Sequence, residues 1–332
     1  MKRILGRSGI EVSAMGMGCW AIGGPNQRTS DGETFIPMGW GQVDDQESIR
    51  AIHAGIDLGV TFFDTANNYG AGRSERVLGK ALVGKRDKVI IATKFGSVFD
   101  EEKKIHFDKD QDFVITPKFI REACESSLHR LQTDVIDLYQ FHWGTYDEER
   151  ALTVRETLEE LVAEGKIRWY GWSTDHPHLA AIFAQGKHCA TIQHRLNVLN
   201  DAPEMLALCA QEGLASINKS PLNAGVLTGK FTEDSVFAED DGRSAVDFKS
   251  ERVTDLLRKV EQVREVLTGN GRSMAQGALA WIWARSNIAI PIPGFKTVQQ
   301  VTDNAGAMQF GPLTDAETRR IDEILEREPI GA

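Results

Sequence analysis

Short apolar runs alternate with longer amphipathic segments along most of the chain. Each run is nearly continuous in apolar or β-branched residues, which is typical of strands buried on both faces of a parallel sheet. Eight runs predict strands in this way, at residues 15–19, 61–66, 89–94, 135–141, 167–172, 190–193, 214–217 and 288–292. Between several of them, apolar residues recur with the period of an α-helix, which predicts helices that pack one face against the sheet.

The helical segments also carry start signals. Asp44 followed by Glu47 resembles a capping box, and we expect the helix that it opens to end near Gly59. Thr116 before Pro117 is an N-cap with proline at the first helical position. These signals support the helices that the apolar periodicity predicts.

Eight strands that alternate with helices predict one closed (β/α)8 TIM barrel, in which residues 1–332 form a single domain. The alternative is an open doubly wound sheet, which holds a dinucleotide with a glycine-rich turn after its first strand. The nearest candidate for that turn is Gly70-Ala71-Gly72, but Glu75 stands where the third glycine belongs. Gly23-Gly24 fails as well, so the pattern favours the barrel.

Two long stretches, at about 23–42 and 223–249, interrupt the alternation and predict irregular loops. Both follow predicted strands, and the first is rich in glycine, proline and polar residues. Because the loops at the carboxyl ends of barrel strands build the active site, we expect both to shape a cofactor or substrate cleft. The alternative is that they are surface insertions.

Composition narrows the classes of function. Hydrophobic residues make up 41% and charged residues 26% of the 332 residues, which predicts a large buried core rather than disorder. A formal net charge of −10 argues against a nucleic-acid binder or a protein of anionic membrane surfaces. It leaves room for a local basic pocket that takes a phosphorylated small molecule.

The four cysteines are scattered, without C-x-x-C pairs or zinc spacing, which predicts reduced thiols and no metal site. The chain has no signal-peptide pattern and no apolar stretch of membrane-spanning length. These observations together predict a cytoplasmic protein. The oligomeric state leaves no mark in the pattern.

Four ionisable residues stand at or just beyond successive strand ends: Asp64, Tyr69, Lys94 and His142. In a barrel all four converge on one rim. Each also has a structural explanation, because the aspartate can cap a helix, the tyrosine can pack as a surface ring, the lysine can be solvated and the histidine can be a hydrogen-bonded core residue. Their joint position on one rim favours a catalytic function.

The chemistry of this set suits the reduction of a carbonyl, which takes a hydride on carbon and a proton on oxygen. The phenol of Tyr69 is a weak acid with an ordinary pKa of about 10, and we expect a nearby Lys94 ammonium to lower that pKa. Asp64 would then be the partner of Lys94 in an apolar strand. His142 can donate a hydrogen bond to the substrate oxygen.

The motifs around these residues resemble the aldo-keto reductase family. Phe62-Phe63-Asp64-Thr65-Ala66, Tyr69-Gly70 and Ser74-Glu75 match its best-known signature, Ala92-Thr93-Lys94-Phe95 its lysine strand, and Gln140-Phe141-His142-Trp143 its histidine strand. The resemblance covers nearly the whole chain and is strongest to bacterial members. It implies an NADP-dependent oxidoreductase that converts an aldehyde or ketone to an alcohol reversibly, with the four residues as catalytic tetrad and Tyr69 as general acid. We expect Trp20 and Trp143 to line the substrate cleft.

The same resemblance places the cofactor, NADP(H). It sets Ser173 and Gln193 near the nicotinamide, with Lys219 at a position that packs on its ring, and it implies that a loop crossing the pyrophosphate contributes Ser220, Leu222, Gly225 and Lys230, although Lys230 can also be a solvated side chain. Towards the carboxyl end, it implies a site for the 2′-phosphate and adenosine at Gly294, Lys296, Thr297, Gln300 and Asn304. Thr297 with Gln300 also fits a capping box, which is the structural alternative for both.

Two positions depart from many relatives. Lys219 stands where an aromatic residue usually stacks on the nicotinamide, although its alkyl stem can still pack on the ring. Thr174 stands where asparagine is common, and its hydroxyl has fewer hydrogen-bonding groups than an amide. Two other functions remain open from the sequence: a nucleotide-binding regulatory subunit of the same fold, and a barrel lyase or isomerase that needs no nicotinamide.

Overall fold

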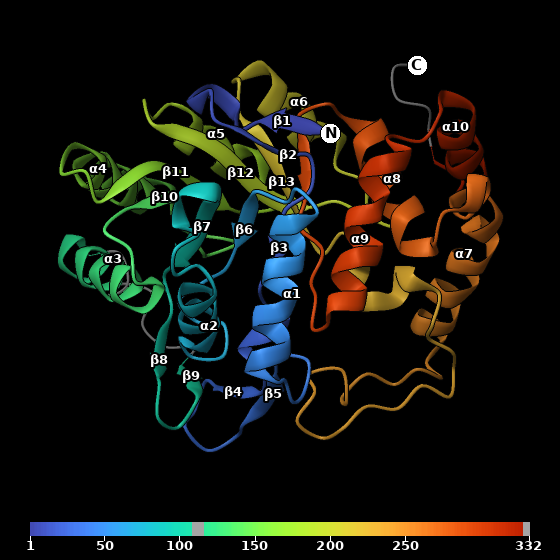
Figure 1. Ribbon diagram of the computed structural model, residues 1–332, viewed down its shortest axis with the longest axis horizontal. Helices are drawn as coiled ribbons and strands as arrows, with labels where there is room; N and C mark the ends of the chain where they lie inside the picture. Colours follow the sequence, from blue (N-terminus) through green and yellow to red (C-terminus); the bar gives the residue numbers. More distant parts are fainter. Residues whose placement is uncertain (108–115, 328–332) are drawn as a thin grey trace.

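Eight parallel strands form the centre of the computed structural model, which describes residues 1–107 and 116–327 (Figure 1). In sheet order they are β14 (Ala289–Pro291), β13 (Ala215–Lys219), β12 (Cys189–Arg195), β11 (Ile167–Ser173), β10 (Ile136–Phe141), β7 (Ile90–Phe95), β6 (Phe62–Asp64) and β3 (Met17–Gly18). The backbone N–H groups of Gly16 and Gly18 donate to the carbonyl oxygens of Pro291 and Pro293, at 2.9 and 3.0 Å. These bonds join the last strand to the first, so the predicted (β/α)8 barrel is confirmed.

Alternate residues of each strand face opposite sides of the barrel wall, as the two-residue period of a strand requires. The side chains facing the interior pack into one apolar cluster, which includes Phe62, Ala92, Leu138 and Ile217. Their neighbours along the strands pack against the surrounding helices in a second, larger cluster, which includes Phe63, Ile91, Tyr139 and Ile192. Both faces of the strands are therefore buried, which explains the continuous apolar runs in the sequence.

Ten α-helices are described, and most of them surround the barrel (Figure 1): α1 (Asp45–Asp57), α2 (Arg73–Ala81), α3 (Pro117–Leu131), α4 (Glu148–Ala163), α5 (Pro177–Ala184), α6 (Pro203–Gln211), α7 (Glu251–Leu267), α8 (Met274–Arg285), α9 (Val298–Phe310) and α10 (Asp315–Ile324). Short 3₁₀ segments are η1 (Gly6–Ser8), η2 (Ala21–Gly23), η3 (Arg86–Lys88), η5 (Asn223–Thr228) and η6 (Gly269–Gly271). Across residues 1–107 and 116–327, no helix is long and apolar enough to cross a membrane.

The predicted helix starts hold, with one difference at α1. Asp44 is its N-cap and accepts from the backbone N–H of Gln46, at 2.8 Å. Glu47 does not complete the expected capping box, because its carboxylate accepts from the backbone N–H of Val298, the first residue of α9, at 2.9 Å. A carboxylate satisfies an otherwise unpaired donor at that helix start, so Glu47 joins α1 to α9 instead of capping its own helix.

A hairpin that the sequence pattern did not predict covers the amino ends of the barrel strands. It consists of β1 (Lys2–Ile4) and β2 (Glu11–Ser13), and its Leu5 and Val12 join the apolar cluster inside the barrel. The packing is tight, since a Cβ on Gly6 would lie 2.1 Å from the carbonyl oxygen of Ala190. The hairpin therefore closes this end of the barrel (top of Figure 1).

At the opposite end, the stretch 23–42 is not the irregular loop that the sequence predicted. It contributes β4 (Asn26–Thr29) and β5 (Ile36–Met38) to a small sheet, completed by β8 (Val98–Asp100) and β9 (Ile105–Phe107). The reason for the error is that β4 is polar and β5 contains Pro37, so neither shows an apolar strand pattern. Instead, β4 pairs with the distant β9, and β5 pairs with β4.

The second long stretch, 223–249, begins with η5 and continues without further helix or strand, as predicted. It contacts the first stretch directly: the N–H of Gly242 donates to the carbonyl oxygen of Gly39 at 3.0 Å, and the Gln42 amide donates to Asp240 at 2.6 Å. Figure 1 shows this segment crossing below the barrel, on the side of β4 and β5. Both stretches therefore lie on the rim formed by the carboxyl ends of the strands.

Candidate active site

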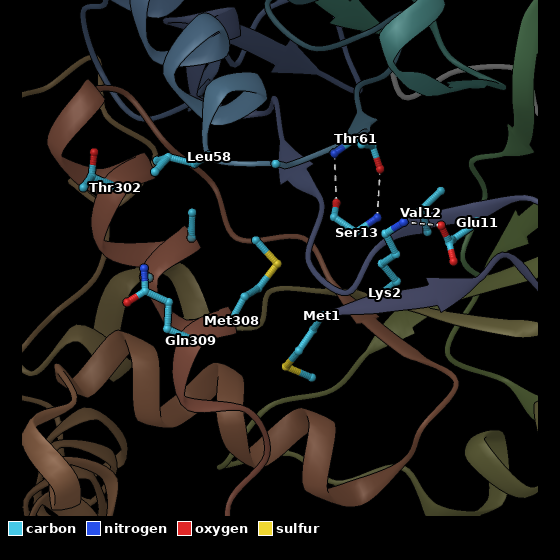
Figure 2. A pocket seen from close by; sticks show the side chains of 13 residues that line it. Met1, Lys2, Glu11, Val12, Ser13, Leu58, Thr61, Thr302, Met308 and Gln309 are labelled. Atoms are coloured by element: carbon cyan, nitrogen blue, oxygen red, sulfur yellow. Dashed lines mark hydrogen bonds and ion pairs between the residues drawn. The ribbon is translucent and has the colours of Figure 1, made fainter.

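Two cavities compete for the functional site. The first, of about 420 Å³, lies beside the β1–β2 hairpin and α9, where Met1, Met308 and Leu58 contribute much of its wall (Figure 2). Ser13 and Thr61 bind each other there through paired hydrogen bonds of 2.8 and 2.9 Å, so their polar groups are already satisfied. This cavity lies near the amino ends of the strands, whereas barrel enzymes use the carboxyl ends.

The second cavity, of about 530 Å³, opens among the carboxyl ends of the strands. Its wall includes these residues that the sequence singled out: Trp20, Asp64, Tyr69, His142, Gln193, Lys219, Ser220, Leu222, Gly225, Lys230, Gly294, Lys296, Gln300 and Asn304. Its size and its mixture of aromatic and charged side chains suit a small-molecule site. It is the candidate active site.

A polar layer of five side chains lies between this cavity and the apolar barrel interior, and three of them, Asp64, Gln193 and Lys219, line the cavity. Each member lies two residues beyond an interior position of its strand, and therefore faces inward as well: Asp64, Lys94, Gln140, Gln193 and Lys219. The sequence places charged or amide side chains near the carboxyl ends of these five strands, and barrel closure brings them together.

Lys94 is the centre of a buried hydrogen-bond cluster. Its ammonium donates to Asp64 Oδ1 at 2.5 Å, to the phenol oxygen of Tyr69 at 3.0 Å and to the carbonyl oxygen of Thr65 at 2.7 Å. All three donors of the ammonium therefore have acceptors, and the Lys94 side chain is completely buried. The structure thus brings together three of the four predicted catalytic residues.

Two amides complete the surroundings of Asp64. Gln140 and Gln193 donate to its second oxygen, Oδ2, at 3.1 and 2.7 Å. Gln193 lines the cavity, as expected for a residue near the nicotinamide, but its amide N–H is bound to the carboxylate. Sequence reasoning gave Gln140 no function, although its position two residues before His142 places it on the same inward face.

The pKa values of Lys94 and Tyr69 both lie above their ordinary values. Burial acts to lower the pKa of Lys94, but the charges and hydrogen bonds of Asp64 and Tyr69 outweigh it. Burial raises the pKa of Tyr69, and the Lys94 charge opposes that rise without cancelling it. The expectation of a lowered tyrosine pKa is therefore wrong, because desolvation of the buried phenolate outweighs the charge of Lys94. Tyr69 is a protonated phenol at neutral pH.

His142 follows β10 and lines the same cavity. Its ring lies 6.0 Å from that of Tyr69, centroid to centroid, and its Nδ1 is buried without a hydrogen-bond partner among the described residues. Burial, followed by the charges of Lys94 and Lys219, holds the pKa of His142 well below its ordinary value. The imidazole is therefore neutral at neutral pH and can donate one hydrogen bond to a ligand.

Aromatic rings form one wall beside Tyr69. Trp20 packs edge-on against Tyr69 with ring centroids 4.8 Å apart, and Trp40 packs edge-on against Trp20 at 6.2 Å. Trp40, which sequence reasoning missed, lies on the stretch 23–42. Trp143 does not line the cavity, because its indole N–H donates to the carbonyl oxygen of Gly96. Its assignment to the substrate cleft stays a prediction without support from this geometry.

The basic residues of the cavity wall include one that the sequence did not single out, Arg243. Its guanidinium forms two hydrogen bonds with Asp241, at 2.7 and 2.9 Å, and lies 4.7 Å from the centroid of the Trp40 ring. The Lys296 ammonium donates to the Trp40 carbonyl oxygen at 2.6 Å. No motif marks Arg243, because only folding of the two loops brings it to the cavity.

Two of the residues predicted to bind the 2′-phosphate and adenosine, Thr297 and Gln300, form hydrogen bonds at the start of α9. The Thr297 hydroxyl caps the helix by accepting from the backbone N–H of Gln300 at 3.3 Å, and the side-chain Oε1 of Gln300 accepts from the backbone N–H of Lys296 at 2.7 Å. The expected capping box is thus shifted by one residue, and Thr297 does not line the cavity. Ser173, the last residue of β11, is buried and does not line it either.

Comparisons with known proteins agree with this geometry. The family model described as "Aldo/keto reductase family" matches residues 14–326. An NADH-specific methylglyoxal reductase of Escherichia coli is 33% identical over 98% of this chain and 100% of its own. Among solved structures, the glycerol dehydrogenase AKR11B4 of Gluconobacter oxydans has a TM-score of 0.79 at 31% identity and covers 97% of this chain and 94% of its own.

A further solved structure contains a nucleotide. It is an aldo-keto reductase of Klebsiella pneumoniae in complex with NADPH, with a TM-score of 0.72 and 26% identity, covering 100% of this chain and 97% of that one. Within the described part of this chain, no group of three or more His, Cys, Asp or Glu side chains is placed to hold a metal ion. The barrel, the sequence match and the site at the carboxyl ends of the strands lead to one conclusion: this chain belongs to the aldo/keto reductase family.

Proposed function

We propose that this protein reduces an aldehyde or ketone to an alcohol with NADPH, reversibly, and that Tyr69 is the proton donor. The observation that carries the proposal is the buried contact of 3.0 Å between the Lys94 ammonium and the Tyr69 phenol, backed by Asp64 and open to the cavity. The test is NADPH consumption with a generic aromatic aldehyde, in the wild type and in the Tyr69→Phe variant.

The cavity wall fits a phosphorylated dinucleotide. It carries four basic side chains: Lys219, Lys230, Arg243 and Lys296. Of its two acidic residues, Asp64 is paired with Lys94, and Asp303 accepts a hydrogen bond from Ser273, the N-cap of α8. Met274 and Ala275, in the first turn of α8, also line the wall, and a helix start favours phosphate through its free N–H groups. When bound, NADPH supplies the hydride for the carbonyl carbon.

The side chains of the chain itself account for the fate of the proton. Tyr69 donates its phenolic proton to the substrate oxygen, because that oxygen becomes strongly basic as the carbonyl carbon is reduced. Lys94 stabilises the phenolate that remains, and Asp64 fixes the position of the ammonium. Neutral His142 donates a second hydrogen bond to the substrate oxygen. Solvent then restores the phenol proton, so the atoms balance to one alcohol.

Lys296 is our candidate for the residue that selects NADPH over NADH. The relatives do not decide which cofactor this chain prefers, because one is named NADH-specific and another was solved with NADPH. We expect Lys296→Met to weaken NADPH by about tenfold and NADH much less, because only NADPH carries the 2′-phosphate. The ratio of kcat/KM for the two cofactors measures this. Lys296→Arg is the matched control and should keep the preference for NADPH. Equal losses for both cofactors would show that the lysine only supports the Trp40 loop.

A further inference from the structure

Lys219 is a second cation in the polar layer of the barrel. It is the last residue of β13 and lies two positions beyond the interior residue Ile217, so it shares the inward face with Lys94 and Asp64. Unlike Lys94, it is not fully enclosed, because its side chain is 28% exposed and lines the cavity. The proposed mechanism gives it no part in proton transfer.

Compensation of the Lys219 charge is incomplete. Its ammonium lies 3.3 Å from Asp175, whose other oxygen accepts from the backbone N–H of Arg195 at 2.7 Å. Arg195 pairs with Lys219 in the register of β12 and β13, and its charge also acts on Asp175, so one carboxylate offsets the charges of two cationic residues. The pKa of Lys219 lies below its ordinary value, because burial lowers it more than the charge and hydrogen bond of Asp175 raise it. The contact of 3.3 Å with Asp175 stabilises the ammonium form, and the charge of that ammonium helps to lower the pKa of His142.

Hydride transfer sets where the reacting ring of the cofactor must lie. The carbonyl oxygen is held by Tyr69 and His142, so the hydride donor lies next to the carbon bonded to it, within van der Waals contact. Gln193 and Lys219 line the same cavity, and Lys219 is near enough for its charge to act on His142. Among the basic residues described in the cavity wall, Lys219 is therefore the one that belongs to the same polar layer as Lys94 and Asp64.

We propose that Lys219 favours the reduced form of the bound cofactor over the oxidised form. The oxidised nicotinamide ring carries a positive charge and the reduced ring carries none, whereas the phosphates have the same charge in both. A fixed cation at the reacting end therefore repels NADP⁺ selectively and leaves NADPH almost unaffected. This inference rests on the proposed function, and it assigns the chain's lysine a part in setting the direction of the reaction.

The test compares dissociation constants of NADPH and NADP⁺, measured without substrate from the quenching of tryptophan fluorescence. We expect Lys219→Met to bind NADP⁺ about tenfold more tightly relative to NADPH than the wild type does. That change equals about 30 mV in the potential of the bound two-electron couple. Lys219→Arg keeps the charge and should keep the wild-type ratio.

Two further variants make the result specific. Asp175→Asn keeps an oxygen for the Arg195 N–H but removes the compensating charge, so at a pH at which Lys219 stays protonated it should shift the ratio in the opposite direction, further towards NADPH. Lys230→Met removes an exposed lysine from the same cavity wall and should leave the ratio unchanged. An unchanged ratio in Lys219→Met, or an equal shift in Lys230→Met, would overturn the inference.

The two proposals fail in different ways. If neither cofactor form binds the wild type, or if Tyr69→Phe keeps full turnover, the proposed function is wrong. If both forms bind and Tyr69→Phe is inactive while the ratio ignores Lys219, only the inference about Lys219 is wrong. Circular dichroism and urea unfolding of Lys219→Met establish that the variant is folded, and Asp175→Asn provides the independent reading if it is not.

Discussion

Replacing Tyr69 by phenylalanine should lower kcat/KM for carbonyl reduction by about 10²- to 10⁴-fold, the usual contribution of a positioned general acid. Phenylalanine keeps the ring that packs on Trp20 at 4.8 Å and removes only the hydroxyl. Binding of NADPH should therefore change little, and the loss should appear in kcat. Steady-state NADPH consumption with an aromatic aldehyde, together with NADPH titration of the same variant, measures both quantities.

A matched control for this variant lies in the barrel wall, away from the cavity. Tyr170, on β11, is also buried and donates its phenol proton to Glu159 at 2.7 Å. Tyr170→Phe likewise removes one hydrogen-bonded hydroxyl and should lower stability by about 1 kcal/mol without an effect on kcat. If both variants lose activity to the same extent, the effect of Tyr69 is structural and its assignment as the acid is wrong.

We expect Lys94→Met to lower both the stability of the fold and the catalytic activity. The change leaves the Asp64 carboxylate buried without its cation, and removing one partner of a buried ion pair destabilises a protein by about 3 to 5 kcal/mol. Gln140 and Gln193 still donate to Asp64, so we expect the lower part of this range. Turnover should also fall strongly, because the Tyr69 phenolate loses its stabilising charge. Urea unfolding measures the first effect and NADPH consumption the second.

A double variant separates the two effects of Lys94. Lys94→Met with Asp64→Asn removes both charges, so it should recover much of the free energy of unfolding that the single variant loses. It should recover no activity, because the phenolate still has no cation beside it. A single variant with wild-type stability would contradict the description of Lys94 and Asp64 as a buried, mutually dependent pair.

The barrel could be predicted from the sequence because its strands are buried on both faces and therefore appear as continuous apolar runs. Each of the eight apolar runs corresponds to a strand of the central sheet. The sequence also predicted the contact of Asp64 with Lys94, because both residues end strands and a closed parallel sheet brings strand ends to one rim. The β1–β2 hairpin and the sheet of β4, β5, β8 and β9 left no such signal, since their short strands are partly polar and depend on tertiary pairing.

The sequence pattern did not predict which loop residues line the cavity. Arg243 and Trp40 reach the cavity only because the two long stretches pair with each other, and no local motif encodes that contact. Trp143 shows the converse: it directly follows His142 in the sequence, but its indole N–H donates to the carbonyl oxygen of Gly96 and it does not line the cavity. The direction of the Tyr69 pKa was also missed, because it depends on how deeply the phenol is buried.

The proton donor is tested most directly by single-turnover hydride transfer from NADPH, measured from about pH 6 to about pH 9 in the wild type and in Tyr69→Phe. Because the pKa of Tyr69 lies above its ordinary value and that of His142 well below, neither group changes its protonation in this range. The account predicts a nearly constant wild-type rate, at least about 100-fold above the variant throughout. Equal rates with the same pH dependence in both proteins would contradict it, since another group would then supply the proton.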